Sequence, residues 1–176
     1  EHERLLDSLG LAGSAFKKVY FDPSLGRQVA IFIPAEEVIV PYGASTLETA
    51  ERVTHEMRKT KNELRKLQAA GFYRTVDLGD PQVFHTDIEE KKAREGGYTI
   101  TDDDRYSLYE IHADLIIDAE EYDKNIVALA GKNNSDDFQI AKPYVVTIER
   151  GTGKILGICR NWNPDDPLTL KRQHFV

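Results

Sequence analysis

Two pairs of short apolar-rich segments, each joined by a turn sequence, constrain the fold of this chain more than any other feature. Residues 16–21 and 28–33 flank the run DPSLG, and residues 144–149 and 154–160 flank RGTG. Proline presets φ for a turn and glycine permits the positive φ that tight turns use, so both pairs are typical of antiparallel β-hairpins. Residues 38–40, which lie between two prolines, form at most a short strand.

One helix is indicated by the sequence at both of its ends. Thr60 is placed as the N-cap and Glu63 falls at the third helical position, which is the pattern of a capping box. Leu64 and Leu67 lie on one apolar face. Gly71 suits the left-handed position that ends a helix. The sequence therefore predicts a helix that begins near residue 61 and ends before Gly71.

The segments that follow this helix are less regular. Residues 72–78 have the composition of a strand, and the Asp-Pro pair after them marks a break. Residues 86–95 favour a helix by propensity, although only Ile88 and Ala93 are available to be buried.

Residues 106–117 alternate well enough to be a long strand with an apolar face. Glu110, His112 and Asp114 fall on its other face, which we expect to be solvated. His112 and Asp114 suggest a metal site only weakly, because two ligands without a third do not make one. Since hairpins and helices occur without βαβ alternation, the sequence predicts an α+β fold with antiparallel hairpins.

The length of 176 residues suits one ordinary domain. We expect a single α+β fragment with a hairpin and a capped helix in residues 16–78, a variable acidic helix or loop in 79–105, and a long strand and hairpin in 106–176. The chain begins with Glu1 and stops within an alternating run, so we expect it to be a piece of a longer protein.

Charge is segregated along the chain. The net charge is -7, yet residues 75–137 carry 6 basic and 17 acidic groups. A net acidic domain is not expected to bind DNA generally, because phosphate binding depends on Lys and Arg. The basic residues beside the capped helix are either solvated or an interaction surface for phosphate or an acidic partner: Arg58, Lys59, Lys61, Arg65 and Lys66. No apolar run approaches the roughly 18 residues of a membrane span, so no membrane partner is expected.

Motifs for catalysis and cofactor binding are missing from the sequence. It contains no GxSxG elbow, no GxGxxG fingerprint and no Walker A loop. The single cysteine, Cys159, lies in an apolar strand and is expected to be a buried structural thiol. We expect no catalytic residue, cofactor or metal. A hydrolase that uses His55, His112 or the loop carboxylates is kept as an alternative.

Three parts of the chain resemble a known family. Residues 16–78 (beginning FKKVYFDPSLGRQVAIFIP), 106–117 (containing YEIHADL) and 143–176 (beginning PYVVTIERGTGKILGICRNW) are similar to segments of phage portal proteins of short-tailed phages and related prophages. Residues 79–105 and 118–142 match poorly, so the acidic loops are the variable part.

The resemblance implies a structural, non-enzymatic role. Portal proteins are ring oligomers at one capsid vertex, through which DNA enters and leaves without sequence-specific binding. The resemblance implies as partners further copies of the chain, terminase, coat and scaffold proteins, and a tail or adaptor protein. It implies a location in the virion, with assembly in the bacterial cytoplasm. The chain would belong to the outer, wing-like portion of a subunit, and as a fragment we expect it to be monomeric or weakly associated.

A non-enzymatic protein-binding module of a larger, unrelated protein is the alternative to this role. Such a module would share only the hairpin and helix pattern with portal proteins.

Overall fold

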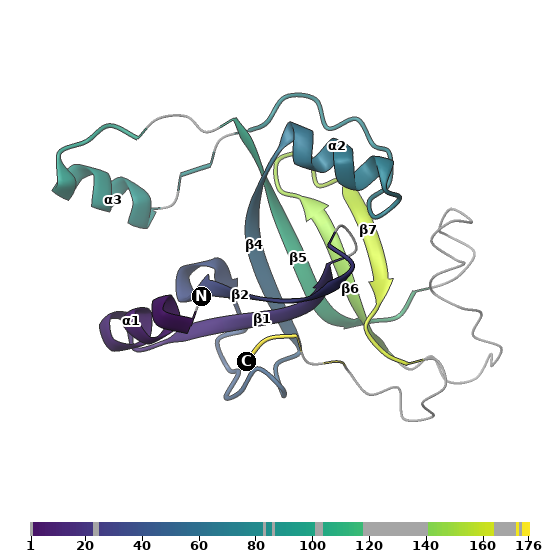
Figure 1. The fold of residues 1–176 in the computed structure, drawn as a ribbon, viewed down its shortest axis with the longest axis horizontal. Coiled ribbons are helices and arrows are strands. Elements are labelled where there is room, and N and C mark those ends of the chain that lie inside the picture. Colours follow the sequence, from purple (N-terminus) through teal and green to yellow (C-terminus); the bar gives the residue numbers. More distant parts are fainter. Residues whose placement is uncertain are drawn as a thin grey trace. The chain divides into compact units, whose positions relative to one another are not determined.

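The computed structural model describes residues 2–22, 25–82, 84–85, 87–100, 104–117, 141–163, 172 and 174–176. These residues form a mixed α+β fold with two antiparallel sheets (Figure 1), which confirms the predicted fold class. One sheet pairs β1 with β2, and the other has the order β3-β4-β5-β6-β7. The elements are α1 (His2–Ala12), β1 (Ala15–Asp22), β2 (Arg27–Pro34), η1 (Ala35–Glu37), β3 (Val38–Ile39), β4 (Arg52–Thr60), α2 (Lys61–Ala69), α3 (Asp87–Gly96), β5 (Arg105–Leu115), β6 (Lys142–Glu149) and β7 (Ile155–Arg160).

The chain divides into two compact units, which we describe separately. Unit 1 comprises Glu1–Glu56, Glu110–Val146 and Ile158–Val176. Unit 2 comprises Met57–Tyr109 and Thr147–Gly157.

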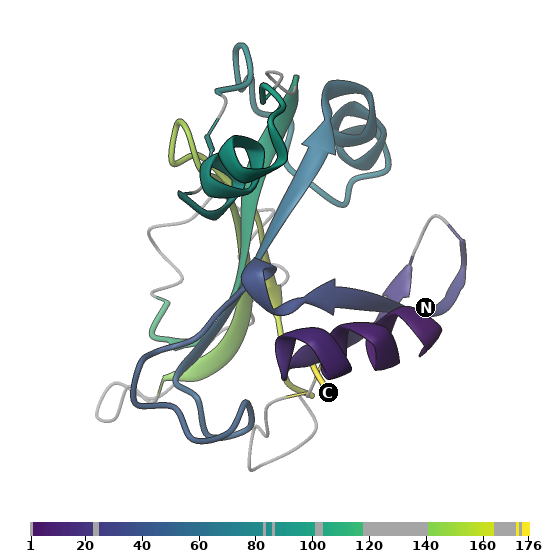
Figure 2. The same cartoon turned by 90° about the vertical axis from the view of Figure 1, so that its left-hand side faces the viewer.

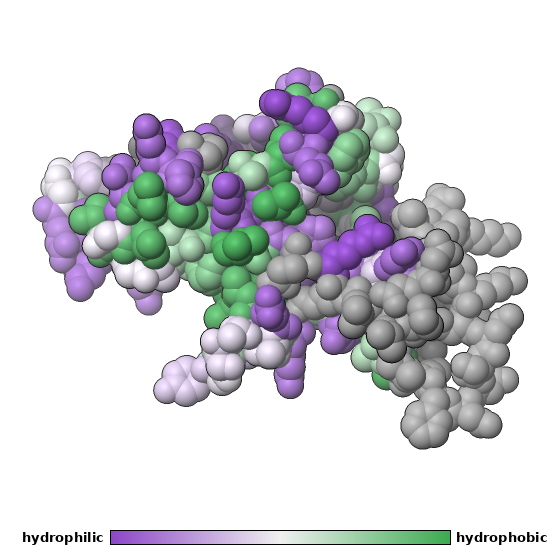
Figure 3. Space-filling model, turned by 60° about the horizontal axis from the view of Figure 1, so that its bottom comes forward, coloured by the Kyte–Doolittle hydropathy of each residue, from purple (hydrophilic) through white to green (hydrophobic). Residues whose placement is uncertain are grey.

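Unit 1 contains the first predicted hairpin. Strands β1 and β2 pair antiparallel, with Phe16 opposite Ile33 and Lys18 opposite Ile31. Helix α1 contacts both strands and lies alongside the hairpin (Figure 2). No residue of α1 is buried, and three of its leucines are exposed: Leu6, Leu9 and Leu11. Figure 3 accordingly shows hydrophobic side chains at the surface beside hydrophilic ones.

The core of unit 1 draws on segments that are far apart in the sequence. Ile33 from β2, Ala50 from the loop after β3, Val53 from β4 and Phe175 near the C-terminus are buried together. Half-buried side chains such as Phe16 pack against them. Burial of this apolar surface is what stabilises the unit, at about 25 cal/mol for each Å² removed from water.

Unit 2 contains the predicted helix, α2. The Thr60 side chain accepts a hydrogen bond from the Glu63 backbone N–H at 3.3 Å, and Glu63 accepts one from the Thr60 N–H at 2.9 Å. The hydrogen bond from the Thr60 N–H lowers the pKa of Glu63. Gly71 has the predicted positive φ of 74°. The capping box and the end of the helix are therefore confirmed.

The apolar face of α2 forms the core of unit 2. Leu64 is buried with Tyr106 and Leu108 of β5 and with Leu156 of β7. Two further members, Tyr73 and Leu78, come from the segment after the helix.

The predicted strand over residues 72–78 is wrong. This segment has no regular secondary structure, although the Arg74 N–H donates to the Leu156 carbonyl of β7 at 2.7 Å. The side-chain amide of Gln68 instead donates to the carbonyls of Arg74 and Val76 at 2.9 and 3.1 Å. These bonds satisfy carbonyls that a ladder would otherwise pair, so the apolar residues are buried without forming a strand.

Helix α3 confirms the second predicted helix. Few of its side chains are buried, as the sequence suggested. Ala93 is buried, but Ile88 is exposed, which corrects the expectation that it packs inward. Helix α1 and strand β4 were not predicted. The strand begins at Arg52 and ends at the N-cap of α2, Thr60.

The β6–β7 hairpin confirms the strongest turn signal in the chain. The Glu149 N–H donates to the Lys154 carbonyl at 2.9 Å, and Gly153 has a φ of 68°. The Glu149 carboxylate accepts hydrogen bonds from the N–H groups of Gly151 and Thr152 and so closes the turn. Residues 118–140, which belong to the acidic loop expected to be variable, lie outside the described residues.

No helix among the described residues is long and apolar enough to cross a membrane.

Candidate functional site

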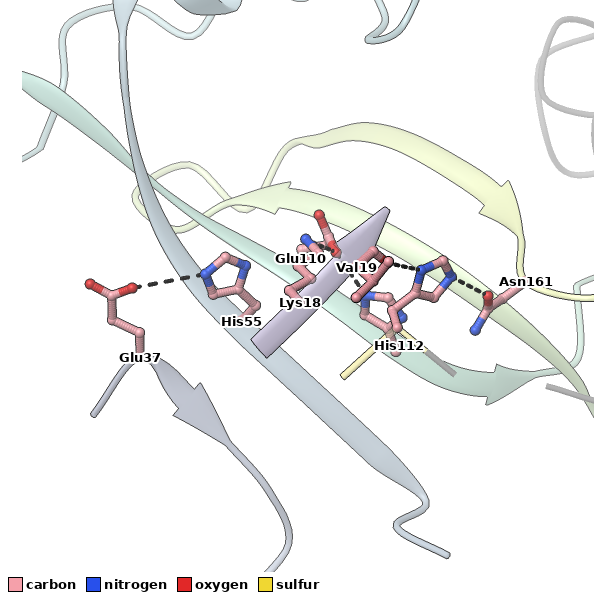
Figure 4. Close-up of polar contacts among 8 residues, drawn as sticks. Lys18, Val19, Glu37, His55, Glu110, His112 and Asn161 are labelled. Carbon is pink, nitrogen blue, oxygen red and sulfur yellow. Dashed lines mark hydrogen bonds and ion pairs between the residues drawn. The ribbon is translucent and has the colours of Figure 1, made fainter. Parts of the chain in front are cut away.

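A buried polar cluster in unit 1 joins the β1–β2 hairpin to β5. The Lys18 ammonium lies 2.5 Å from Oε1 of Glu110, and Nε2 of His112 lies 2.7 Å from the same oxygen (Figure 4). Lys18 and His112 are buried, and the Glu110 side chain is only 15% exposed. The prediction that this face of residues 106–117 is solvated is therefore wrong at Glu110 and His112. Asp114, the third residue of that face, is exposed as expected.

The electrostatics of Glu110 follow from its two partners. Burial alone would raise the pKa of this carboxyl group, because it disfavours the charged form. The hydrogen bond from His112 and the positive charge of Lys18 outweigh burial and hold the pKa well below its usual range. Glu110 is therefore a buried carboxylate near neutral pH, and Lys18 supplies the opposite charge that such a group requires.

A second part of the cluster is built around His174, near the C-terminus. Its Nε2 lies 2.7 Å from Oδ1 of Asn161, and its Nδ1 lies 3.2 Å from the carbonyl oxygen of Val19. The Asn161 amide nitrogen donates to the Arg172 carbonyl at 3.1 Å, which orients its oxygen toward the histidine. Burial lowers the pKa of His174. Asn161 and His174 thus connect the end of β7 to β1.

The C-terminal residues pair with the free edge of β1. Phe175 stands opposite Lys18 in an antiparallel bridge. The N–H of Lys17 donates to the Val176 carbonyl at 2.8 Å, the N–H of Val176 donates back at 2.9 Å, and the Val19 N–H donates to the His174 carbonyl at 2.8 Å. Phe175 thus forms an isolated bridge with β1, and residues 164–171 and 173 lie outside the described part.

Two histidines contact the side chain of Phe175. The rings of His112 and His55 meet it edge to face, at centroid distances of 5.0 and 6.3 Å. The ring of His174 lies 5.2 Å from that of His112. The Lys18 ammonium lies 5.8 Å from the Phe175 centroid. The Phe175 ring therefore contacts two of the five histidines of the chain, and a third, His174, contacts one of these two.

His55, one of the alternative catalytic residues, is 4% exposed. Its Nε2 lies 3.9 Å from Oε2 of Glu37 (Figure 4), too far for a hydrogen bond. Its Nδ1 has no hydrogen-bond partner among the described residues. His55 and His112 both contact Phe175, so the structure brings these two histidines to the same place.

The polar side chains of this cluster bond to each other and to the backbone, so they form a polar network. Lys18 and His112 both bond to Oε1 of Glu110, and His174 bonds to Asn161 and to the backbone carbonyl of Val19. Such a network rigidifies the elements that contribute to it when its members are satisfied. Within the described part of the chain, no group of three or more His, Cys, Asp or Glu side chains could hold a metal ion.

The basic residues predicted as an interaction surface lie in unit 2, on the end of β4 and on α2. Arg58 forms an ion pair of 2.5 Å with Glu89 of α3. Lys59 is half-buried, whereas Lys61, Arg65 and Lys66 are exposed on α2. Arg58, Lys61, Arg65 and Lys66 are therefore the exposed residues of the predicted surface, and Arg58 also forms an ion pair with α3.

The prediction of a buried Cys159 is wrong. This residue of β7 is exposed, because the alternation of the strand turns its neighbours Leu156 and Ile158 inward instead. Partial desolvation, together with the negative charge of Glu110, raises the pKa of its thiol.

Some of this cluster was not predicted from the sequence. Lys18 lies between Phe16 and Tyr20 on the same face of β1. A lysine on an apolar strand face is a signal for a buried ion pair. His174 and Asn161 show no such signal, because their contacts depend on how the C-terminal residues return to β1.

No protein-family model matches the chain, and no curated protein matches it significantly in sequence.

Proposed function

We propose that the chain is a structural segment of a phage portal protein, the ring oligomer at a capsid vertex through which DNA is packaged and ejected. The observation that carries this proposal is the resemblance of residues 16–78, 106–117 and 143–176 to portal segments. In this role the chain is not an enzyme and lies in the outer, wing-like portion of the subunit.

The charged and imidazole side chains of unit 1 join distant segments of the chain, and this supports a structural role. Lys18, Glu110 and His112 join a hairpin to a sheet, and His174 joins the end of the chain to the same hairpin. A portal subunit has to keep its shape while DNA moves past it and partners attach. A buried network that ties distant segments together serves that purpose.

The charge distribution is compatible with a DNA conduit. A net charge of -7 gives little phosphate attraction, and a wall that attracts phosphate weakly lets the duplex slide. The exposed basic side chains of α2, Lys61, Arg65 and Lys66, are the described surface that we assign to an acidic partner protein such as terminase or a tail adaptor.

Electron microscopy of the chain within its full-length protein tests the proposal. We expect closed rings of uniform subunit number. Isolated monomers or open filaments would overturn it. Charge reversal on α2, Lys61→Glu with Lys66→Glu, should leave the rings intact and weaken the binding of purified terminase or adaptor, with Lys91→Glu in α3 as the matched control.

A protein-binding module of an unrelated protein is the second candidate, and one observation favours it. Leu6 and Leu9, which lie three residues apart on α1, expose their apolar side chains, and exposed apolar groups on one face mark interaction sites. The electron-microscopy experiment separates the candidates, because a module of this kind does not form closed rings.

A further inference from the structure

Strand β2 has one paired edge and one open edge among the described residues. Its neighbour in the two-stranded sheet is β1. The other edge of β1 is occupied, because the N–H groups of Lys17 and Val19 donate to carbonyls within residues 174–176. In an antiparallel ladder the N–H and C=O of one residue point to the same side, and successive residues alternate between the two sides. Lys18, which lies between Lys17 and Val19, therefore turns its backbone groups to β2.

This alternation determines which residues of β2 point away from β1. Lys18 stands opposite Ile31, so Ile31 faces β1 and the residues next to it in the strand do not. Gln28 and Ala30 are at outward positions, and their N–H and C=O groups point to the open edge. Both residues are exposed, and neither forms a backbone hydrogen bond to a further described segment. Helix α1 contacts both strands and so lies against a face of the hairpin (Figure 2).

The open edge lacks the features that commonly protect an edge strand. Residues 28–33, QVAIFI, contain no charge and no proline, and most of them are apolar residues with high β-propensity. The pairing of β1 with β2 runs residue for residue without a bulge. Charged side chains, prolines and bulges are the usual means by which edge strands avoid pairing with another chain. An edge without them is suited to the addition of a strand.

We propose that the open edge of β2 binds a second copy of this chain, with the two β2 strands antiparallel about a two-fold axis at Ala30. The result is a continuous sheet in the order β1-β2-β2-β1 across the two copies. The inference concerns unit 1 alone and does not depend on a portal function.

A two-fold axis at Ala30 is a register in which the outward-pointing residues of the two copies meet. Ala30 faces Ala30 of the second copy, so the N–H of each can donate to the C=O of the other. Gln28 faces Phe32 of the second copy, and no charged side chain is opposed within residues 28–32. The interface is isologous, which means that the same edge serves both copies and that assembly stops at the dimer.

The charges at the two ends of β2 favour a second copy in this orientation. Arg27 begins the strand, and Glu36 and Glu37 follow it in η1, and all three are exposed. Antiparallel pairing about Ala30 places Arg27 opposite Ile33 of the second copy, a few residues from the two carboxylates. Opposite charges therefore approach each other at both ends, whereas parallel pairing would bring like charges together. This match in charge is the reason to assign the edge to a second copy rather than to an unrelated extended peptide.

Sedimentation velocity of the chain over a range of concentrations tests the proposal. We expect a reversible dimer with a dissociation constant of about 0.1 mM, because the pairing of two strand edges is a small interface. Ala30→Pro removes the outward N–H and leaves the bonds to β1, so it should weaken the dimer at least about tenfold. Ala30→Ser, the matched control, keeps the N–H at the same exposed position and should change the dissociation constant by less than about threefold.

Charge reversal separates self-pairing from other kinds of association. Arg27→Glu should weaken the dimer, because it places three carboxylates at each end. Arg27→Glu combined with Glu36→Arg and Glu37→Arg should restore it, since each end again carries opposite charges. An effect of Arg27→Glu on the hairpin alone would not be reversed in this way.

A chain that stays monomeric at about 1 mM, oligomers larger than a dimer, or a dimer that Ala30→Pro leaves unchanged would overturn the proposal. Failure of the reversed charges to restore the dimer would overturn it as well. Should circular dichroism show that Ala30→Pro does not fold, amide hydrogen exchange in the native chain decides. Protection of the Gln28 and Ala30 amides that rises with protein concentration supports the proposal, and protection independent of concentration overturns it.

Discussion

Lys18 of β1 and Glu110 of β5 form an ion pair of 2.5 Å in the interior of unit 1, with side chains only 6% and 15% exposed. Two charges are rarely buried unless each compensates the other, because either one alone has lost its hydration. The pair is therefore a point at which the hairpin and the sheet depend on each other.

Substitution of Glu110 by Gln should destabilise the chain by about 3–5 kcal/mol, because it leaves the Lys18 ammonium buried without a counter-charge. Urea unfolding followed by circular dichroism measures this change. The double variant Lys18→Met with Glu110→Gln should lose less than Glu110→Gln alone, since the uncompensated charge is gone. A double variant less stable than the single one would contradict this account of the pair.

Acid should weaken the fold through the same carboxylate. The pKa of Glu110 is lowered in the folded state, so its ionisation stabilises the fold fully above the unfolded pKa of about 4.3. That stability is lost as the pH falls from there toward the folded pKa. The free energy of unfolding, measured from pH 6 to 3, should fall more steeply in the native chain than in Glu110→Gln. Equal slopes would show that Glu110 does not titrate differently in the two states.

The capping box of α2 should contribute a measurable part of the stability. Thr60→Ala removes the acceptor of the Glu63 N–H and should cost about 1 kcal/mol in the free energy of unfolding. Thr75→Ala, at an exposed position of the segment after the helix, is the matched control and should change stability by less than about 0.5 kcal/mol. If both changes have the same effect, the cap is not important to the helix.

Two glycines should respond to alanine in opposite directions. Gly153 has a φ of 68°, so Gly153→Ala should destabilise the β6–β7 turn by about 1–2 kcal/mol. Gly10 lies within α1 and has open space around the position of a Cβ, so Gly10→Ala should stabilise the helix by up to about 1 kcal/mol. Thermal unfolding of both variants checks this prediction, and a loss of stability in Gly10→Ala would contradict it.

Cys159 should react slowly at neutral pH although it is exposed. Desolvation and Glu110 raise the pKa of its thiol, and the thiolate is the reactive form. With a disulfide reagent at pH 7.5, we expect a slower reaction in the folded chain than in urea. The folded chain of Glu110→Gln should react faster than the native one, because a negative charge near the sulfur is lost. A native rate equal to the rate in urea would show that the thiol is not perturbed.

The hairpins and the capped helix were predictable because local sequence is sufficient to specify them. The turn at Gly153 and the capping box at Thr60 involve residues only a few positions apart, and their geometry depends on backbone preference and short-range hydrogen bonds. The same local propensity was misleading at residues 72–78. There the Gln68 side chain takes the carbonyl bonds that a strand partner would have taken.

The sequence by itself determined the α+β class, the two hairpins and the start of α2, since each depends on neighbours along the chain. Only the tertiary structure decided that His112 is buried, that Cys159 is exposed, and that His174 bonds to Val19, 155 positions away. The burial of a strand face depends on what covers it, and the cover at β5 comes from β1 and the C-terminal residues. Polar residues that look solvated in sequence can thus become an interior network when distant segments supply their hydrogen-bond partners.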